Sequence, residues 1–592
     1  MSAVVLAAIG IGAVFAGYRF YSKFIAEKIY QLDPDFETPA HTMRDDIDYV
    51  PTNRVVLWGH HFTAVAGAAP IIGPSIAVVW GWLPAFLWVV IGTIFFAGVH
   101  DFGAIWASIR NKAQSVGSFT GEVVSHRARA LFMIVVFFLL LMVNAVFAVA
   151  ISEALVAAPA SVIPVWSAIV VAVVIGVLLY KVGVGITWPT IVGTIVLYAV
   201  IWLGELVPLE LPASIVGLGP QAQWILILFA YAAVASMLPV WLLLQPRDYI
   251  NGIQLFVGLG ILYGAVLLAS PTVVAPAINP NLPPATPPIF PLLFVTIACG
   301  AISGFHGLVS SGTTSKQLNK ETDARFVGYL GSLGEGALAI VAIIAATAGF
   351  ASLADWQAVY VNTEFTALGG VTAFVQGGAT IASNGLGLPF TFAQTLLTVM
   401  AVLFAGTTMD AGVRLQRYII QEWGTIYHIP QFQNGYLATG LAVSACLVLA
   451  FGATPPGAPL GTGGMAIWPL FGTTNQLLAG LTLLVISVIL VKLGRPARYT
   501  LIPMVFVTIM SFLSALIQLR DLYSTEQWVL LGIDVMIIIC AIFVLLEAAS
   551  ALMRERRIAA ATATAGTNSR QQAVQIRPMK FLVMPSHEDS TL

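Results

Sequence analysis

The sequence predicts an all-α polytopic membrane protein with about 15 transmembrane helices. Hydrophobic residues make up 58% of the 592 residues and charged residues only 9%, whereas soluble domains are about 45–50% apolar and about a quarter charged. The mean hydropathy of +0.91 describes the whole chain, so many apolar segments are required rather than one anchor. The 26 Lys and Arg residues balance 27 Asp and Glu residues, so no net positive field indicates a nucleic-acid partner.

Each predicted span is a stretch of about 20 mostly apolar residues, which crosses a bilayer core of about 30 Å. In chain order the spans are residues 2–18, 56–82, 84–107, 131–156, 164–180, 187–207, 223–244, 251–270, 289–315, 328–349, 391–413, 436–452, 465–491, 499–518 and 528–550. The first is expected to be a retained helix, because its basic residues follow the apolar stretch instead of preceding it. The three cysteines lie inside apolar runs and are expected to be small core residues.

The basic residues predict the orientation of the chain. If the N-terminus is outside and every span crosses once, all Lys and Arg residues except Arg520 fall in cytoplasmic segments. This distribution obeys the rule that basic residues stay on the cytoplasmic side. We therefore expect an outside N-terminus, a cytoplasmic C-terminus and a multi-pass protein in contact with the lipid bilayer.

The segments between spans are short. Residues 271–291 contain eight prolines and are expected to be an extended outer loop. Residues 371–383 are expected to form an amphipathic helix along the outer interface. Residues 551–592 become polar and are expected to be a disordered cytoplasmic tail.

The span 56–82 contains several residues that interrupt helices. They are Gly67, Pro70, Gly73 and Pro74. Such residues free backbone carbonyl groups within the membrane, an arrangement that transporters use for substrate and ion sites. A proline kink used only for packing is the alternative. The nearby His60 and His61 favour a binding site.

The span 289–315 carries four hydroxyl side chains close to His306. They are Ser310, Ser311, Thr313 and Thr314. Neutral oxygens of this kind can bind sodium. The alternative is that each hydroxyl bonds to the carbonyl group four residues earlier in its own helix.

Ionisable residues within spans are costly, at about 2.5–3.5 kcal/mol or more, and usually face a partner or a cavity. They are His100, Asp101, Glu153, Glu335, Asp410, Asp534 and Glu547. Asp101 or Glu335 is a candidate proton carrier, unless each is only ion-paired. Asp410 lies one helical turn before Arg414, which predicts an ion pair between them. His100 and Asp101 point about 100° apart on a helix and need not touch.

Parity predicts an inverted repeat. Residues 56–207 and 223–413 hold five spans each, so the two groups cross the membrane in opposite senses. The leading span of the second group carries Pro239 and Pro246 beside Ser236, which predicts a second interrupted helix. Residues 1–55 would form an N-terminal helix and cytoplasmic loop, and residues 436–550 four accessory helices. Asn475 in this last region is expected to line a cavity or to bond between helices.

Several motifs together resemble the carbon starvation protein A family of bacterial inner-membrane transporters. They are Gly59–Phe62 with Ala66–Pro74, His100–Phe102, Ser303–Gly307 with Ser310–Thr314, Arg325–Glu335, Asp410 with Arg414–Glu422, and Trp468–Gln476. The resemblance implies uptake of peptides or pyruvate during carbon starvation and a LeuT-type fold. It also implies alternating access coupled to a proton or sodium gradient, with no other cofactor and no resident metal.

The resemblance places the substrate among the broken helices and the third helix of the core. The expected substrate residues are His60, His61, Gly67, Ala68, Pro70, Ser236 and His306. The expected ion-coupling residues are Gly67, Ala69, Ser310, Ser311, Thr313, Thr314, Asp101 and Glu335. The expected structural or gating residues are Pro74, Pro239, His100, Asp410, Arg414 and Asn475.

A membrane enzyme or redox protein with histidine-ligated haem or metal is the main alternative function. His60, His61, His100 and His306 are the available ligands. The sequence has no His-Glu-x-x-His, Cys-x-x-Cys-His or phosphate-binding loop, so we expect a transporter rather than an enzyme. The substrate, the coupling ion and the oligomeric state remain open at this point.

Overall fold

The computed structural model describes residues 1–45, 48–185, 187–239, 241–284, 286–363, 370–454, 458–462 and 464–564. Their regular structure is helical, apart from isolated β-bridges. The first helices are α1 (Ala3–Ala16), α2 (Ser22–Phe24), α3 (Pro39–Thr42), α4 (Arg54–Ala66), α5 (Ala69–Ala77), α6 (Trp82–Gly92), α7 (Gly98–Arg110), α8 (Val116–Val123), α9 (His126–Ala157), α10 (Val162–Val177), α11 (Thr187–Leu206), α12 (Pro220–Met237) and α13 (Leu244–Ala269). The others are α14 (Ile289–Thr296), α15 (Gly304–Val309), α16 (Ser315–Gln317), α17 (Leu330–Ala348), α18 (Leu353–Tyr360), α19 (Gly370–Leu386), α20 (Phe390–Ile426), α21 (Pro430–Gln433), α22 (Gly435–Gly452), α23 (Gly464–Lys492), α24 (Arg498–Ser524) and α25 (Trp528–Thr564).

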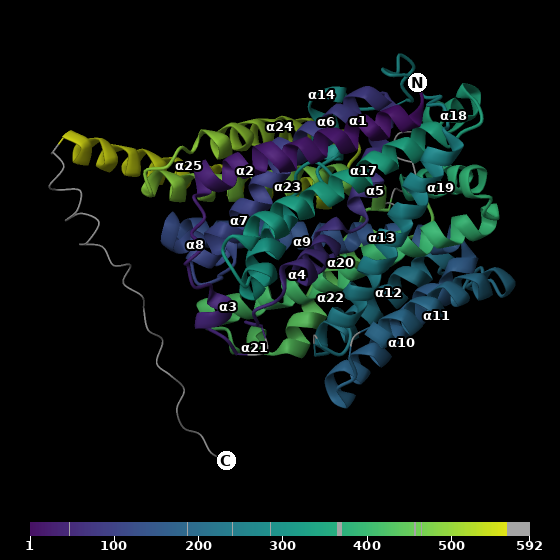
Figure 1. Ribbon diagram of the computed structural model, residues 1–592, viewed down its shortest axis with the longest axis horizontal. Helices are drawn as coiled ribbons and strands as arrows, with labels where there is room; N and C mark the ends of the chain where they lie inside the picture. Colours follow the sequence, from purple (N-terminus) through teal and green to yellow (C-terminus); the bar gives the residue numbers. More distant parts are fainter. Residues whose placement is uncertain are drawn as a thin grey trace.

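The predicted polytopic membrane architecture is confirmed. Thirteen helical stretches of the described chain are long and apolar enough to span a membrane, and α4 with the segment Ala69–Trp80 forms one further span bent by 48°. The interrupted series α14–α16 occupies the remaining predicted position. The chain starts at the right of Figure 1 and α25 ends at the left, as an odd number of crossings requires.

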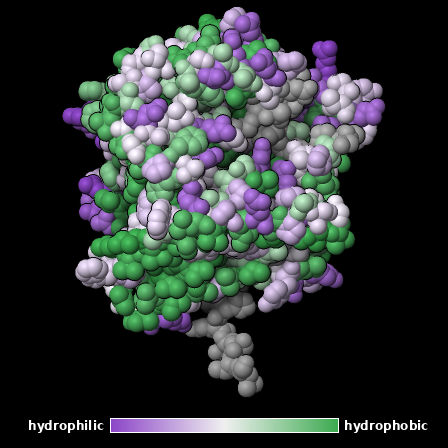
Figure 2. All heavy atoms as spheres, turned by 90° about the vertical axis from the view of Figure 1, so that its right-hand side faces the viewer, coloured by the Kyte–Doolittle hydropathy of each residue, from purple (hydrophilic) through white to green (hydrophobic). Residues whose placement is uncertain are grey.

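The deepest spans are α9, α17, α20 and α23. Figure 1 shows α1 and α24 along the upper side and α10 and α11 along the lower right. α10 and α11 expose apolar residues such as Val174, Ile195 and Trp202, and apolar side chains cover the lower part of the face in Figure 2. Because lipid is apolar, these surfaces are suited to face the bilayer.

Side-chain caps fix where several helices begin. Ser2 accepts a hydrogen bond from the Val4 backbone N–H at the start of α1, and Asn53 accepts one from Val55 at the start of α4. Asn434 accepts from two N–H groups of α22. These caps satisfy donors that the first helical turn leaves without a partner.

The predicted span over 289–315 is interrupted in the structure. α14 ends at Thr296 and α15 begins at Gly304, and the seven residues between them are not helical. Gly300 lies in this break with a φ of +93°, a conformation that side chains other than glycine rarely adopt. The break is therefore set by one glycine and by a long-range contact described below, without any proline inside it.

The predicted interruption of the span 223–244 is wrong. α12 ends at Met237, Pro239 lies in the connection that follows, and Pro246 lies in the first turn of α13. Proline is tolerated in a first turn because its missing N–H would have no helical partner there. These prolines separate two helices, and the second broken helix is the one over 289–317. The grouping of the spans into two repeats remains a prediction.

Two further segments can be compared with expectation. α19 forms a helix over the predicted 371–383 and packs against α13, α17 and α20, because its glycines allow close approach: Gly377 lies against the backbone of Ala345. Its position along the outer interface remains a prediction. α25 continues to Thr564, so the predicted tail 551–592 begins as helix in an alanine-rich stretch that favours it. Residues 565–592 of the predicted tail lie outside the described residues.

Candidate functional site

The first helix break lies between α4 and α5. Gly67 ends α4 with a φ of +42°, and Pro70 in the first turn of α5 has no N–H to donate. A methyl group on Gly67 would lie 2.9 Å from Thr408 Oγ1 of α20 and 3.8 Å from Phe147 of α9. The break therefore faces two of the deepest helices.

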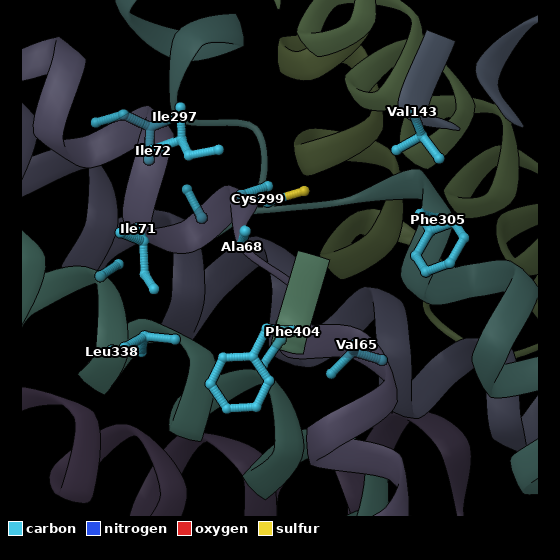
Figure 3. Packing of buried hydrophobic residues seen from close by; sticks show 14 of the residues in the cluster. Val65, Ala68, Ile71, Ile72, Val143, Ile297, Cys299, Phe305, Leu338 and Phe404 are labelled. Carbon is cyan, nitrogen blue, oxygen red and sulfur yellow. The ribbon is translucent and has the colours of Figure 1, made fainter. Parts of the chain in front are cut away.

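The two breaks lie against each other. A methyl group on Gly73 of α5 would lie 2.4 Å from the Thr296 carbonyl oxygen, and one on Gly300 would lie 3.5 Å from Pro70. Figure 3 shows Cys299 of the second break beside Ala68 of the first. Unwound backbone from two helices thus meets at one place, the arrangement in which transporters build midplane sites.

Asn475 of α23 stabilises the second break through hydrogen bonds. Its side-chain oxygen accepts a hydrogen bond from the Phe305 backbone N–H at 2.9 Å, and its amide group donates to Ser303 Oγ at 3.0 Å. Phe305 lies in the first turn of α15, where backbone donors have no helical partner. Asn475 therefore acts between helices, one of its two predicted roles.

A buried network of acidic and imidazole groups lies beside the breaks. Asp101 of α7 accepts a hydrogen bond from His100 Nδ1 at 2.7 Å on one carboxylate oxygen. Its other oxygen accepts from His306 Nδ1 of α15 at 2.9 Å and from Ser332 Oγ of α17 at 2.6 Å. His100 and Asp101, which need not have touched, are thus in contact.

His306 links two carboxylates from different helices. Its Nε2 lies 3.3 Å from Oε1 of Glu335 on α17, while its Nδ1 donates to Asp101. All three side chains are buried. When His306 is protonated and both carboxylates are ionised, the three groups carry one net negative charge, which is costly in the membrane interior. One added proton removes that charge, so the chemistry of the network suits reversible proton binding.

This network lies close to the second helix break. His306 lies in the helix that follows the second break, and Ala339, one turn after Glu335, would be 2.9 Å from a methyl group on Gly300. Glu335 therefore lies one helical turn from the contact between α17 and the second break.

The hydroxyl cluster is mostly engaged within its own helix. Ser311 Oγ donates to the Gly307 carbonyl at 2.6 Å and accepts from the Val116 N–H at 3.0 Å. Thr313 Oγ1 donates to the Val309 carbonyl at 2.9 Å. These bonds follow the back-bonding alternative.

The other two hydroxyls differ. Thr314 Oγ1 forms a 2.9 Å hydrogen bond with His61 Nδ1 of α4, whereas buried Ser310 Oγ has no hydrogen-bond partner among the described residues. The series α14–α16 thus does face α4. A methyl group on Gly67 would meet Thr408 and Phe147 and no hydroxyl of this cluster, and the expected cation pocket between the break and the cluster remains a prediction.

The remaining candidates lie away from the network. His60 is half-buried on α4, and Ser236 Oγ donates to the Ala233 carbonyl within α12. Pro74 lies inside α5, beside the contact of Gly73 with α14, and Pro239 is exposed. Of the predicted substrate residues, Pro70 of the first break lies against the second break, and His306 lies in the helix that follows the second break.

The predicted ion pair between Asp410 and Arg414 is wrong. Asp410 is paired with Arg247 of α13, and Arg414 donates to the carbonyl groups of Ala235 and Leu238 at the end of α12. Arg247 reaches Asp410 from another helix, whereas Arg414 is drawn to carbonyl groups that the end of α12 leaves without helical partners.

Cys299, His306 and Glu335 offer three potential metal-ligand atoms within 4.8 Å of one another. Protein groups already engage them, because Asn475 Nδ2 lies 3.1 Å from Cys299 Sγ and His306 lies between its two carboxylates. His306 Nε2 and both Glu335 carboxylate oxygens, however, have no hydrogen-bond partner among the described residues.

Sequence reasoning missed several residues near these sites. They are Ser332, Cys299, Thr408, Asn251, Tyr231 and Arg247. Arg247 gave a usable signal, since it is a charged residue next to Asp248 and close to a predicted span. The hydroxyl and thiol groups gave none, because serine, threonine and cysteine are ordinary in membrane helices.

Comparison with known proteins agrees with this architecture. A family model described as carbon starvation protein CstA matches residues 2–355 and 350–514. The peptide transporter CstA of Campylobacter jejuni is 33% identical over 563 residues, which cover 86% of this chain and 79% of that protein. The pyruvate/proton symporter BtsT of Escherichia coli is 31% identical over 585 residues, covering 86% and 80% respectively.

Among solved structures, a crystal structure of the Eremococcus coleocola manganese transporter is similar in fold. It gives a TM-score of 0.51 at 13% identity and covers 86% of this chain and 99% of that one. At this identity the likeness concerns the fold alone. It agrees with the LeuT-type core that the sequence resemblance implied.

Proposed function

The chain belongs to the carbon starvation protein CstA family, and from this premise we propose that it imports small carboxylate nutrients together with protons. The proposed substrates are pyruvate-like acids or small peptides, because its relatives are named as transporters of these solutes. The proposed setting is the bacterial cytoplasmic membrane, with the N-terminus outside and the C-terminus in the cytoplasm.

The observation that carries the proposal is the position of His306 between Asp101 and Glu335. With His306 protonated and both carboxylates ionised, these three residues carry one net negative charge. Binding of one more proton neutralises this buried charge and is therefore favourable. The hydroxyl cluster gives weaker support for sodium, since Ser311 and Thr313 already donate to their own helix.

Coupling follows if the proton and the substrate both stabilise the same arrangement of the two breaks. The substrate carboxylate would bind to backbone N–H groups at the start of α5 or α15, where the helix dipole favours an anion. An anion that enters with one proton carries no net charge, so the membrane potential would not drive its uptake.

The test is uptake of labelled pyruvate, and separately of a labelled dipeptide, into proteoliposomes under a proton or a sodium gradient. We expect the wild type to accumulate one of these solutes under the proton gradient, and Asp101→Asn to lose this accumulation. Asp521→Asn, which changes an exposed carboxylate at the end of α24, is the matched control and should behave as wild type. Accumulation driven by sodium alone would contradict the proposal.

A further inference from the structure

α20 packs against α12 and α13 along a strip of charged and polar residues. We call this strip the arginine seam, and it consists of the buried Arg247, Asp248 and Asn251 of α13, the buried Thr407, Asp410 and Arg417 of α20, and the half-buried Arg414 of α20. The transport mechanism proposed above uses none of these residues. Charged side chains inside a membrane protein usually mark a functional path or face a cavity.

The end of the seam at Asn251 and Thr407 lies next to the first helix break. Asn251 Nδ2 donates to Thr407 Oγ1 at 2.7 Å. The next residue, Thr408, is the one that a methyl group on Gly67 would meet at 2.9 Å. The seam therefore begins where the candidate substrate site lies.

The middle of the seam is an ion pair closed by a tyrosine. Arg247 donates to Asp410, and its Nη1 also donates to the Tyr231 hydroxyl at 2.7 Å. The Tyr231 hydroxyl in turn donates to Asp410 at 2.8 Å. Three helices meet at this point, because Tyr231 comes from α12.

The opposite end of the seam, at Arg414 and Arg417, contacts the C-terminal end of α12. Arg414 donates to the Ala235 and Leu238 carbonyl groups at 2.9 and 2.8 Å. Arg417, one turn further along α20, lies with its Nη1 3.0 Å from the Met237 sulfur. By the predicted topology this end points to the cytoplasm.

Much of the hydrogen-bonding capacity of the seam is unused in the closed interface. The atoms without a hydrogen-bond partner among the described residues are Arg247 Nε and Nη2, Asp248 Oδ1, Asn251 Oδ1, Asp410 Oδ1, Arg414 Nε and Arg417 Nε. Each such buried group costs about 1–3 kcal/mol. Arg247 Nη2 and Asp248 Oδ1 lie 3.9 Å apart as an ion pair, a separation too long for a hydrogen bond. A purely structural ion pair would be expected to satisfy its own members with hydrogen bonds, so this row of atoms supports an interface that also opens.

The net charge of the seam determines whether it favours an anion or a cation. Three guanidinium groups stand against the carboxylates of Asp248 and Asp410, which leaves one positive charge. Guanidinium groups bind carboxylates through paired N–H donors, and Arg247 has such donors unused. An anion is therefore favoured over a cation along this strip.

We propose that the arginine seam is the route by which an anionic carboxylate passes from the first helix break to the cytoplasm, with Arg247 as its binding residue on the way. This inference rests on the proposed function for the direction of transport. When α12 and α13 separate from α20, the seam becomes an aqueous passage with a positive lining. The Arg247–Asp410 pair closes it again.

The test measures whether a thiol in the seam reacts preferentially with an anion. Thr407→Cys in lipid nanodiscs is treated with a sulfonate-bearing and with an ammonium-bearing methanethiosulfonate reagent, and each rate is divided by that of a free thiol. Asn251→Cys repeats the test from the opposite helix. Ser487→Cys is the control, because Ser487 of α23 is buried and hydrogen-bonded to the Thr500 hydroxyl of α24. The reaction of the protein that has only its buried native cysteines defines the background rate.

We expect both seam cysteines to react, with a normalised preference for the sulfonate of about tenfold, and Ser487→Cys to stay at background. Adding Arg417→Gln should reduce the preference several-fold, because one of the three positive charges is removed. Seam cysteines that stay at background, or equal rates with the two reagents, would overturn the proposal. The thiol-labelling test uses no nutrient, so its result does not depend on the uptake experiment. A failure of pyruvate or peptide uptake would contradict the proposed function but not the result of the labelling test.

Discussion

Ser311 shows how a side chain suited to an ion can serve the protein itself. Its hydroxyl donates to the Gly307 carbonyl and accepts from the Val116 N–H, the first backbone donor of α8. That donor has no partner within its own helix. The hydroxyl is therefore part of the packing between α8 and the hydroxyl cluster.

We predict that Ser311→Ala lowers the free energy of unfolding by about 1–2 kcal/mol, because the Val116 N–H loses its acceptor. The cation dependence of uptake should not change. Ser310→Ala is the matched variant and should cost less, since the Ser310 hydroxyl has no hydrogen-bond partner among the described residues. Thermal unfolding in detergent gives the first quantity and uptake with varied sodium the second. A loss of sodium dependence only in Ser311→Ala would restore a sodium site here.

Single residues also show what a sequence can and cannot reveal about the site. Asp101, Glu335 and His306 could be identified because ionisable groups are rare inside spans. Their grouping could not, since Asp101 of α7 is 205 residues from His306 of α15. Asp410 was assigned to Arg414 by helical spacing, but spacing describes only one helix, and Arg247 approaches from another.

At the scale of elements, the two breaks differ in how much the sequence reveals. The first contains Gly67 and Pro70, which interrupt helices through their own backbone properties. The second has only Gly300 inside it and depends on Asn475, which lies 170 residues beyond the N–H group that it satisfies. A local pattern could therefore predict the first break but not the second.

The contact between the breaks can be tested at Gly73. A methyl group there would lie 2.4 Å from the Thr296 carbonyl oxygen, so Gly73→Ala forces α5 and α14 apart. We expect a loss of about 1–3 kcal/mol in stability and a lower uptake rate. Gly12→Ala in α1, which meets nothing within 4 Å, should have neither effect. Equal thermal unfolding of the two variants would show that the breaks do not pack as described.

At the scale of the whole molecule, composition predicted the membrane fold and the approximate positions of the thirteen spanning helices and of the bent span. This succeeded because hydropathy is a local property and a bilayer imposes one span length. The same reasoning gave no information on which helices adjoin, so it could not reveal the arginine seam or the meeting of the two breaks. The charge network and the breaks are the two features on which the proposal of proton-coupled import rests.

The most direct test of this claim is to measure proton entry caused by substrate. Proteoliposomes containing a pH-sensitive dye, with no imposed gradient, receive pyruvate or a dipeptide outside. We predict that the transported solute acidifies the lumen in the wild type and that this acidification is absent in Asp101→Asn. Raising the external pH should slow it, because fewer protons are available to bind. Solute entry in the wild type without any acidification would contradict the account.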